Sequence, residues 1–390
     1  MGEWPMVKLG EVARVVAGGT PKTSVLEYWD GDIPWVTPKD LALSESLWIN
    51  AGERFITDYG LAKSAAALLP RGTVLWSSRA PIGLVAIANN QIATNQGFKS
   101  FVPGGELDSE YLAYFLIHQR PILEMMGVGA TFKEVSAKRA AEIMVPLPPL
   151  GEQKRIAEIL GGVSKAIQKT KVQLLLVDIL KENKYLSLSK DADTFKSLKD
   201  LGVKKITGKS IVAKPDNEHD INQIIKVSAV SSGRFIASET KPLPADYEPN
   251  NLHEIHQGDL LFARASGSAN LLGACCIVDK EIQHLYLPDK VWKLEADEDI
   301  LPKVYLLQAL RGREFRSVAE SHFSSSTGVK NIKTSVLMEF KIPVLKQDQL
   351  NDYVHFVKTL DNLRHLLHRK LSLLQELQKS LANRAFAGLL

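Results

Sequence analysis

One segment of the sequence is close to a nucleotide-binding loop. Thr207-Gly208-Lys209-Ser210 matches the end of the motif in which backbone amides and a lysine hold phosphate groups. That motif also needs a glycine at the first position of its window, where this sequence has Val203, and Gly202 lies one residue too far. The pattern therefore predicts a turn near the start of a second domain rather than an NTPase site.

Carboxylates and histidines that could bind a metal ion are present without the partners they need. Asp30, Asp32 and Asp40 could serve a nuclease, but the Trp-Gly and Ile-Pro-Trp residues around them are typical of strands and turns. His253 and His256 have the spacing of two ligands on one helix face, yet no third ligand accompanies them. We therefore expect no metal-binding residues.

The residues expected of a methyltransferase or of a cysteine-based site are missing as well. A methyltransferase would need a glycine-rich cofactor loop and an Asn/Asp-Pro-Pro-aromatic site, whereas Pro148-Pro149 has leucine on either side. Cys275 and Cys276 are too few for a disulfide framework or a four-ligand metal site. The sequence thus predicts no catalytic residues, no cofactor and no enzymatic activity in this chain.

Polar and cationic side chains suited to DNA punctuate the loops of both halves. Arginine can form two hydrogen bonds to guanine, asparagine and glutamine can do so with adenine, and lysine neutralises phosphates. The candidates in the first half are Lys22, Thr23, Thr37, Lys39, Ser77, Ser78, Arg79, Asn95, Gln96, Thr131 and Lys133. Those in the second half are Lys226, Ser228, Arg234, Arg264, Ser266, Lys330 and Lys333.

Each of these candidates has a structural alternative. A single lysine is usually a solvated surface charge, and Asn95-Gln96 could satisfy the backbone of a turn. Trp29 and Trp35 suit a core better than base stacking. Arg79 and Arg264 are the favoured contacts, because both follow a Gly-x-x-Leu-aromatic strand and precede a turn containing glycine.

The elements that must position these residues occur twice. Glu152-Gln153 and Asp348-Gln349 are 196 positions apart, and each follows a proline-containing segment and precedes a helical pattern. Tyr111-Leu112 matches Tyr305-Leu306, at an offset of 194. Gly72-Thr73-Val74-Leu75-Trp76 resembles Gly258-Asp259-Leu260-Leu261-Phe262. The shared order predicts a duplicated unit of globule plus helix.

Two long helices are predicted from apolar residues that recur in steps of three and four. The seam of the first helix is Ile156, Leu160, Val163, Ile167, Thr170, Leu174 and Val177. That of the second is Leu350, Tyr353, Val357, Leu360, Leu367, Leu371, Leu374, Leu381 and Ala385, with interruptions at Arg364 and Gln378. Helices of about 50 Å are too long for one small domain to cover, so mutual pairing is expected. The alternative is two amphipathic helices packed on separate cores.

Chain order then predicts that the paired helices run antiparallel, with one globule at each end. Apolar positions away from the seams need a further protein surface to cover them. These partner-interface candidates are Leu175, Leu176, Phe356, Leu363, Leu366 and Leu373.

Composition sets wide bounds. The 390 residues are 45% hydrophobic and 24% charged, as in a folded globular protein, and the net charge of +4 permits a polyanionic partner. No apolar run reaches the ~18–20 residues of a membrane span, and the N-terminus has no signal-peptide pattern. We therefore expect a cytoplasmic protein without membrane association.

Four segments resemble the specificity subunits of Type I restriction-modification systems. The helix entry Val145-Pro146-Leu147-Pro148-Pro149-Leu150-Gly151-Glu152-Gln153 is similar to their conserved region. Gly18-Gly19-Thr20-Pro21, Tyr28-Trp29-Asp30-Gly31-Asp32-Ile33-Pro34-Trp35 and Thr94-Asn95-Gln96-Gly97-Phe98 resemble the first recognition domain. The second half lacks the Tyr-Trp run, so its resemblance is weaker.

The resemblance implies an α+β chain with two mixed α/β target-recognition domains, separated by two long antiparallel coiled-coil helices as a pseudo-two-fold repeat. The expected domains are residues 1–148 and 189–345, and the expected spacer helices are residues 149–188 and 346–390. It further implies a bipartite double-stranded DNA target, two methyltransferase subunits docked on the helices, and a restriction motor subunit that can join them. The alternative function is a protein-interaction scaffold of the same fold that does not read DNA.

Overall fold

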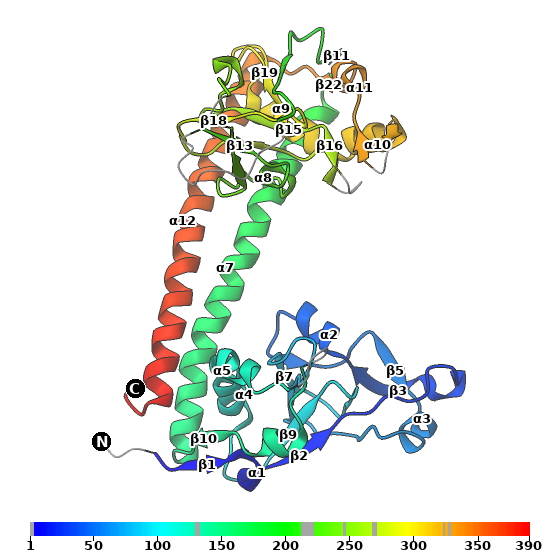
Figure 1. Cartoon of the computed structure of the whole chain (residues 1–390), viewed down its shortest axis with the longest axis vertical. Helices are drawn as coiled ribbons and strands as arrows, with labels where there is room; N and C mark the ends of the chain where they lie inside the picture. The colour runs from blue at the N-terminus through cyan, green and yellow to red at the C-terminus, as the bar shows by residue number, and fades with distance from the viewer. Residues whose placement is uncertain are drawn as a thin grey trace. The chain divides into compact units, whose positions relative to one another are not determined.

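The computed structural model describes residues 4–128, 133–211, 222–244, 247–266, 271–322, 324–326 and 329–390. The chain forms two compact units, residues 1–172 with 367–390 and residues 173–366. Two long helices, α7 (Leu150–Lys190) and α12 (Gln347–Phe386), each contribute one part to each unit (Figure 1). Among the described residues, no helix combines the length and the apolar character that crossing a bilayer requires.

The first unit contains two sheets and a closing strand pair. The larger sheet has the order β2 (Ala13–Ala17), β9 (Lys99–Pro103), β6 (Val74–Trp76), β7 (Val85–Ala88), β4 (Trp48–Ile49). The smaller has the order β5 (Arg54–Ile56), β3 (Trp29–Val36), β8 (Ala93–Thr94). β1 (Met6–Lys8) pairs antiparallel with β10 (Met144–Pro146), which joins the start of the domain to its end. The helices beside these sheets are α1 (Leu9–Val12), η1 (Leu26–Tyr28), α2 (Pro38–Leu43), α3 (Asp58–Ala62), α4 (Ser109–His118), α5 (Arg120–Met125) and α6 (Ala137–Ala141).

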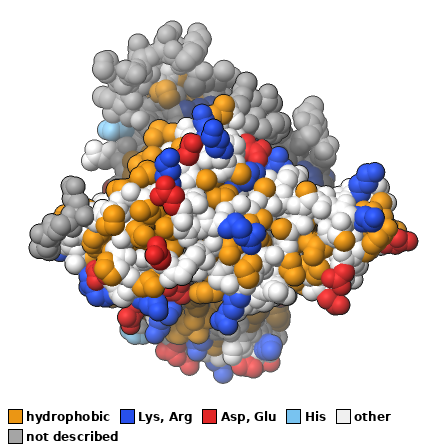
Figure 2. Space-filling model, turned by 90° about the horizontal axis from the view of Figure 1, so that it is seen from below, with side chains coloured by type: hydrophobic (Ala, Val, Ile, Leu, Met, Phe, Trp, Pro, Cys, Tyr) orange, Lys and Arg blue, Asp and Glu red, His pale blue; other side chains and the backbone are white. Residues whose placement is uncertain are grey.

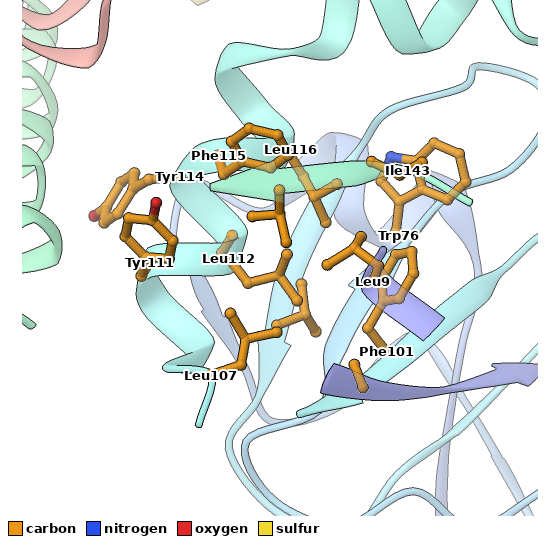
Figure 3. Packing of buried hydrophobic residues seen from close by; sticks show 14 of the residues in the cluster. Leu9, Trp76, Phe101, Leu107, Tyr111, Leu112, Tyr114, Phe115, Leu116 and Ile143 are labelled. Carbon is orange, nitrogen blue, oxygen red and sulfur yellow. The ribbon is translucent and has the colours of Figure 1, made fainter. Parts of the chain in front are cut away.

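Helix α4 brings the core of the first unit together. Asp108 caps it by accepting hydrogen bonds from the amides of Glu110 and Tyr111, both at 3.0 Å. Leu112 and Leu116 are fully buried, and they lie between the other α4 side chains and the sheet residues Trp76 and Phe101 (Figure 3). Burial of each such side chain contributes about 1.5–3 kcal/mol, so this helix is a large part of what holds the sheet.

The second unit repeats these parts. Its larger sheet has the order β12 (Lys204–Thr207), β19 (Val291–Glu295), β15 (Leu260–Ala263), β17 (Cys275–Ile277). Its smaller sheets have the orders β14 (Thr240–Pro242), β13 (Gln223–Ile225), β18 (Leu285–Tyr286), and β16 (Ala265–Ser266), β21 (Val329–Asn331), β20 (Ser324–Ser326). β11 (Phe195–Ser197) pairs antiparallel with β22 (Lys341–Pro343). The helices are α8 (Ser228–Ser231), η2 (Asn251–His253), α9 (Lys303–Arg311), α10 (Arg313–His322) and α11 (Thr334–Met338).

The predicted duplication is confirmed by strand pairing. β2-β9-β6-β7 and β12-β19-β15-β17 are both antiparallel in the same order. In the sheets β5-β3-β8 and β14-β13-β18 the central strand has one antiparallel and one parallel neighbour. The turns also agree, because Gly72 and Gly258 precede β6 and β15 with φ of 87° and 91°. Only glycine adopts this backbone conformation readily, which explains the repeated glycine in the sequence.

In each domain a tyrosine hydroxyl bonds to a backbone carbonyl just before the long helix that follows. The Tyr111 hydroxyl donates to the carbonyl of Pro146 at 2.8 Å, and the Tyr305 hydroxyl donates to that of Pro343 at 3.0 Å. In the first unit Gln153 adds a second closure. Its buried amide accepts from the Asp108 amide and donates to the Glu106 and Pro148 carbonyls, each at 2.8 Å.

The predicted helix seams are buried or half-buried along both helices. The two interruptions are explained by hydrogen bonds across the pair. In the first unit Gln378 donates to the Ser164 hydroxyl at 2.7 Å, and in the second Arg364 pairs with Asp178. Lys181, itself in the seam of α7, pairs with Asp361 in the second unit. As the α7 number rises from 164 to 178 and 181, the α12 number falls from 378 to 364 and 361. Equal and opposite steps are the signature of antiparallel helices, as expected.

An apolar band on the two helices is left uncovered within each unit. Leu175, Leu363 and Leu366 in the second unit are exposed to 61%, 43% and 60%, and Leu373 in the first unit is exposed to 56%. Leu176 is also exposed, whereas Phe356 is half-buried. The band lies beside the seam rather than in it, so the helix pair itself cannot cover these side chains.

The buried Lys181–Asp361 pair is expected to respond unequally to loss of its two members. Lys181→Met keeps an apolar chain in the seam and leaves Asp361 half-exposed to water, so stability should stay the same or rise. Asp361→Ala strands a buried ammonium group, which should cost roughly 1–3 kcal/mol. Urea unfolding of the full chain measures both variants, with Asp352→Ala as an exposed control. Equal losses from both members would contradict the prediction.

Candidate nucleic-acid interface

In the first unit, backbone hydrogen bonds bring four candidate loops to one end of the sheets. The Asn95 amide donates to the Val36 carbonyl at 3.0 Å, which places the 95–97 loop beside the start of α2. The Ser78 amide donates to the Gly97 carbonyl at 2.7 Å, and its carbonyl accepts from the Val135 amide at 3.0 Å. Segments around residues 37, 78, 96 and 134 therefore lie next to one another although they are far apart in sequence.

The two tryptophans of the Trp-x-Gly-x-Ile-Pro-Trp segment hold a further loop against this end. The Trp35 indole donates to the Gly19 carbonyl at 2.9 Å, and the Trp29 indole donates to that of Lys22 at 3.2 Å. Both rings are 5% exposed and pack edge to face, with centroids 5.1 Å apart. They are core residues, as the structural alternative held, and their role is to fix the loop that carries Lys22 and Thr23.

Several candidate side chains of the first unit are engaged with the protein itself. Ser77 donates to the Pro81 carbonyl at 2.7 Å and Ser78 to that of Gly97 at 3.1 Å, and both residues are fully buried. Thr37 and Asp40 form a capping box at the start of α2. Asn95 accepts from the Gly97 amide at 2.9 Å. These residues shape the loops, because their polar atoms are already occupied or turned away from solvent.

The remaining candidates of the first unit are at least partly open to solvent. Lys22, Thr23 and Lys133 are exposed, and Lys39 is exposed and paired with Glu53 at 3.1 Å. Gln96 is exposed and bonded to the Thr20 hydroxyl. Thr131 lies outside the described residues.

Arg79 belongs to a cluster of three charged residues. Its Nη1 lies 3.8 Å from the Glu134 carboxylate, and the Lys99 Nζ lies 2.9 Å from the other oxygen of that carboxylate. Lys99 is 8% exposed, so its charge is inside the domain, whereas the Arg79 side chain is 34% exposed. Lys99 and Glu134 were not predicted from the sequence, because nothing in Lys99-Ser100-Phe101 distinguishes a buried lysine from a solvated one.

The second unit gathers a corresponding group. The Arg264 amide donates to the Lys290 carbonyl at 3.0 Å, and its carbonyl accepts from the Ile332 amide at 2.8 Å. Arg264, Ser266, Lys330 and Lys333 are thereby brought together, although only the backbone of Ser266 is described. The Arg264 guanidinium lies 5.6 Å from the centre of the Trp292 ring, which orients it by cation–π attraction.

Strand register shows that the two favoured arginines are not equivalent. β2 faces β9 with Ala17 opposite Lys99, and β12 faces β19 with Thr207 opposite Trp292. Ser78 and Arg264 make matching backbone bonds, so Arg264 corresponds to Ser78. Arg79 corresponds to Ala265, since they pair with Glu134 and Asn331 respectively. The sequence match placed the two arginines in the same region but one position out of step.

The same register explains the segment that resembled a phosphate-binding loop. Gly208 follows β12 as Gly18 follows β2. A Cβ atom on Gly208 would lie 1.7 Å from the Leu287 carbonyl oxygen, and one on Gly18 would lie 1.9 Å from that of Asn95. Both glycines are required by a close backbone approach. Lys209 and Ser210, which are exposed, therefore occupy the place of the Gly19-Thr20 loop and were missed as candidates.

A second group of candidates in this unit surrounds helix α8. Ser228 donates to Glu239 at 2.6 Å, and Lys226 lies 3.8 Å from the same carboxylate. Arg234 is exposed on the turn that follows α8. In sequence, β14 and β15 lie between these residues and Arg264.

In the described part of the chain, the residues considered for metal binding do not form a metal site. No group of three or more His, Cys, Asp or Glu side chains there could hold a metal ion. His256 bonds instead to Glu281 at 3.2 Å, and Asp40 caps α2. Burial raises the pKa of Cys275 to about 11 and that of Cys276 to about 12, so both thiols are protonated at neutral pH.

On the face drawn in Figure 2, lysine and arginine side chains are scattered among acidic and hydrophobic ones rather than gathered into one patch. The candidate interface is placed by the convergence of the loops described above.

Comparison with known proteins identifies the repeated unit. Residues 1–176 match the family described as the Type I restriction modification DNA specificity domain. The first 176 residues are thus similar to a Type I specificity domain. The loops around Arg79 and the helix entry at Gln153 lie within the matched residues.

Individual relatives extend the likeness to the whole chain. The Type I restriction enzyme MjaIX specificity subunit of Methanocaldococcus jannaschii is 41% identical over 174 residues, which are 44% of this chain and only 40% of that protein. The EcoKI specificity subunit of Escherichia coli K12 is 22% identical over 99% of this chain and 89% of that protein. The family resemblance predicted from the sequence is thereby confirmed.

A solved structure shows the same fold. The Type I restriction-modification system S subunit from M. genitalium has a TM-score of 0.58 at 13% identity, and the match covers 98% of this chain and 96% of that one. The two-domain fold with its long helices is therefore that of S subunits.

Proposed function

We propose that this chain is the non-catalytic DNA-recognition subunit of a Type I restriction-modification complex, with one recognition domain for each half of a bipartite target. The observation that carries the proposal is a single strand framework present twice with different polar side chains at its loop end. Arg79, Glu134 and Lys99 occupy positions that hold Ala265, Asn331 and Trp292 in the second copy. Equal frameworks with unequal side chains suit two readers of different base sequences.

The recognition domains of this proposal are residues 1–148 and 189–345, and the spacer helices are residues 149–188 and 346–390. In the first domain the contacts are Arg79, Gln96, Lys22, Thr23, Lys39, Thr131 and Lys133. In the second they are Arg264, Lys226, Ser228, Arg234, Ser266, Lys330 and Lys333. The helix pair keeps the two domains at a fixed separation, so the length of the helices sets the spacer between the half-sites.

The partner subunits in this proposal are two methyltransferases, which dock on the exposed apolar band around Leu175, Leu176, Leu363, Leu366 and Leu373, with Phe356 at its edge. Two features support this assignment. Several exposed leucines form the band, rather than a single one. The band is also next to the helix seam, which the two helices already bury. The methyltransferases supply the chemistry, and restriction subunits join the same complex.

Arg79→Ala is expected to weaken recognition of one half-site and to leave the other unchanged, and Arg264→Ala should do the opposite. Loss of one bidentate contact to guanine costs roughly 1–3 kcal/mol, or about 10- to 100-fold in affinity. Sequencing of methylated DNA from cells that carry each variant measures the half-sites separately. Arg71→Ala is the matched control, because Arg71 is exposed at the opposite end of β6. Loss of both half-sites in either variant would contradict the assignment.

Shortening both helices by matching segments should change the spacer alone. Residues 165–171 and 371–377 lie between the Ser164–Gln378 and Asp178–Arg364 contacts, so removing both keeps the helix seams aligned. Seven residues at 1.5 Å shorten the pair by about 10 Å, which corresponds to a spacer shorter by roughly one to three base pairs. Methylated-site sequencing reads the result. Altered half-sites with an unchanged spacer would refute the role given to the helices.

Replacing Leu175 and Leu366 with glutamate should abolish co-purification of the methyltransferase, since a charge in an apolar interface costs several kcal/mol. Ser187→Glu with Ser380→Glu adds the same charge at exposed polar positions of the same helices and should bind normally.

Gel shifts with the assembled complex distinguish DNA recognition from a pure scaffold. A DNA-binding complex shows log affinity falling linearly with log salt concentration, whereas a scaffold gives no sequence-dependent shift.

A further inference from the structure

The Glu134 carboxylate is shared unequally between two cations. Its contact with Lys99 is 2.9 Å and its contact with Arg79 is 3.8 Å. The lysine side chain is 10% exposed, whereas those of Arg79 and Glu134 are 34% and 38% exposed. The stronger partner of the carboxylate is therefore the cation that faces the inside of the domain, and the weaker partner is the one that faces solvent.

Lys99 pairs closely with the Glu134 carboxylate because Lys99 is buried. Lys99 extends from β9, where Ala17 of β2 lies opposite it, and an ammonium group in such a place is costly unless it is paired. Glu134 is the carboxylate within ion-pair distance of it in the described part of the chain. Because its amine is held inside the sheet, Lys99 is poorly placed to contact a DNA phosphate directly.

Because Glu134 is shared with Lys99, Arg79 is held in place without its guanidinium N–H groups being taken up by the carboxylate. Arginine and a carboxylate at close range form two parallel hydrogen bonds, and an arginine so bound has few donors left for another partner. Here the negative charge of Glu134 is already balanced by Lys99. Arg79 is kept near the carboxylate by attraction at 3.8 Å and by backbone pairing of residues 79 and 134, and its guanidinium donors stay available.

We propose that Lys99 is a positioning residue for DNA recognition: it neutralises Glu134, and this prevents Glu134 from sequestering Arg79. The inference rests on the proposed function, because it takes Arg79 to be a base-reading residue. Its effect is confined to the first half-site. At the equivalent positions the second domain has Trp292, Asn331 and Ala265, and it orients Arg264 on the Trp292 ring instead of on a carboxylate.

The test uses the full chain assembled with its methyltransferase and measures affinity for target DNA. Lys99→Met removes the charge and keeps the length of the side chain, so Glu134 should capture Arg79 and affinity should fall roughly 10-fold, the lower end for a lost bidentate contact. Lys99→Met with Glu134→Gln removes both charges, and this double variant should recover most of the lost affinity. In an Arg79→Ala background, Lys99→Met should have no further effect.

A structural role for Lys99 would give a different pattern. If Lys99→Met weakened binding only by disturbing the sheet, the added Glu134→Gln would not restore affinity, and the positioning role would be overturned. Unchanged affinity in Lys99→Met would overturn it as well. Thermal unfolding checks that each variant folds, and Lys99→Gln provides a second route to the same charge change.

The outcomes also separate this inference from the function on which it rests. If Arg79→Ala leaves the first half-site unchanged, the base-reading role of Arg79 is wrong and the role of Lys99 falls with it. If Arg79→Ala weakens the first half-site while Lys99→Met has no effect, the positioning role alone is wrong.

Discussion

Burial of charged and polar residues in the seams of α7 and α12 is the constraint on which the rest of the structure depends. Two helices with apolar heptad seams can pair again after one slips by seven residues along the other, because apolar positions recur at that interval. A slip would set Lys181 opposite Val354 or His368 instead of Asp361. A buried ammonium group then has no carboxylate, and this penalty selects one register.

The duplicated framework shows how two domains of one chain can diverge without loss of fold. The conserved parts are backbone pairings, the glycines at positive φ, and the tyrosines that bond to Pro146 and Pro343. None of these depends on the side chains at the loop end of the sheets. The Arg79 cluster and the Arg264–Trp292 pair can therefore differ while the strands that carry them keep the same order.

Sequence reasoning was most successful where periodicity reports burial directly. The seams of both helices are buried or half-buried as expected, and Arg364 and Gln378, which looked like defects, are cross-helix hydrogen-bonding residues. It was least successful for single polar residues in loops. Ser77 and Ser78 were candidates for DNA contact, but they are buried, because Ser77 donates to the Pro81 carbonyl in the turn after β6 and Ser78 donates to the Gly97 carbonyl in the loop before β9.

By itself the sequence determined the two long helices, the duplication and the candidate loops, because repeat order and helical period are local properties of a chain. The tertiary structure decided which loop residues meet. Lys99 and Glu134 are 35 positions apart, and the pairing of β9 with β6 together with the bridge between residues 79 and 134 brings both of them beside Arg79. Burial and ion pairing are properties of that assembled environment, so no pattern of residue types along the chain could have specified them.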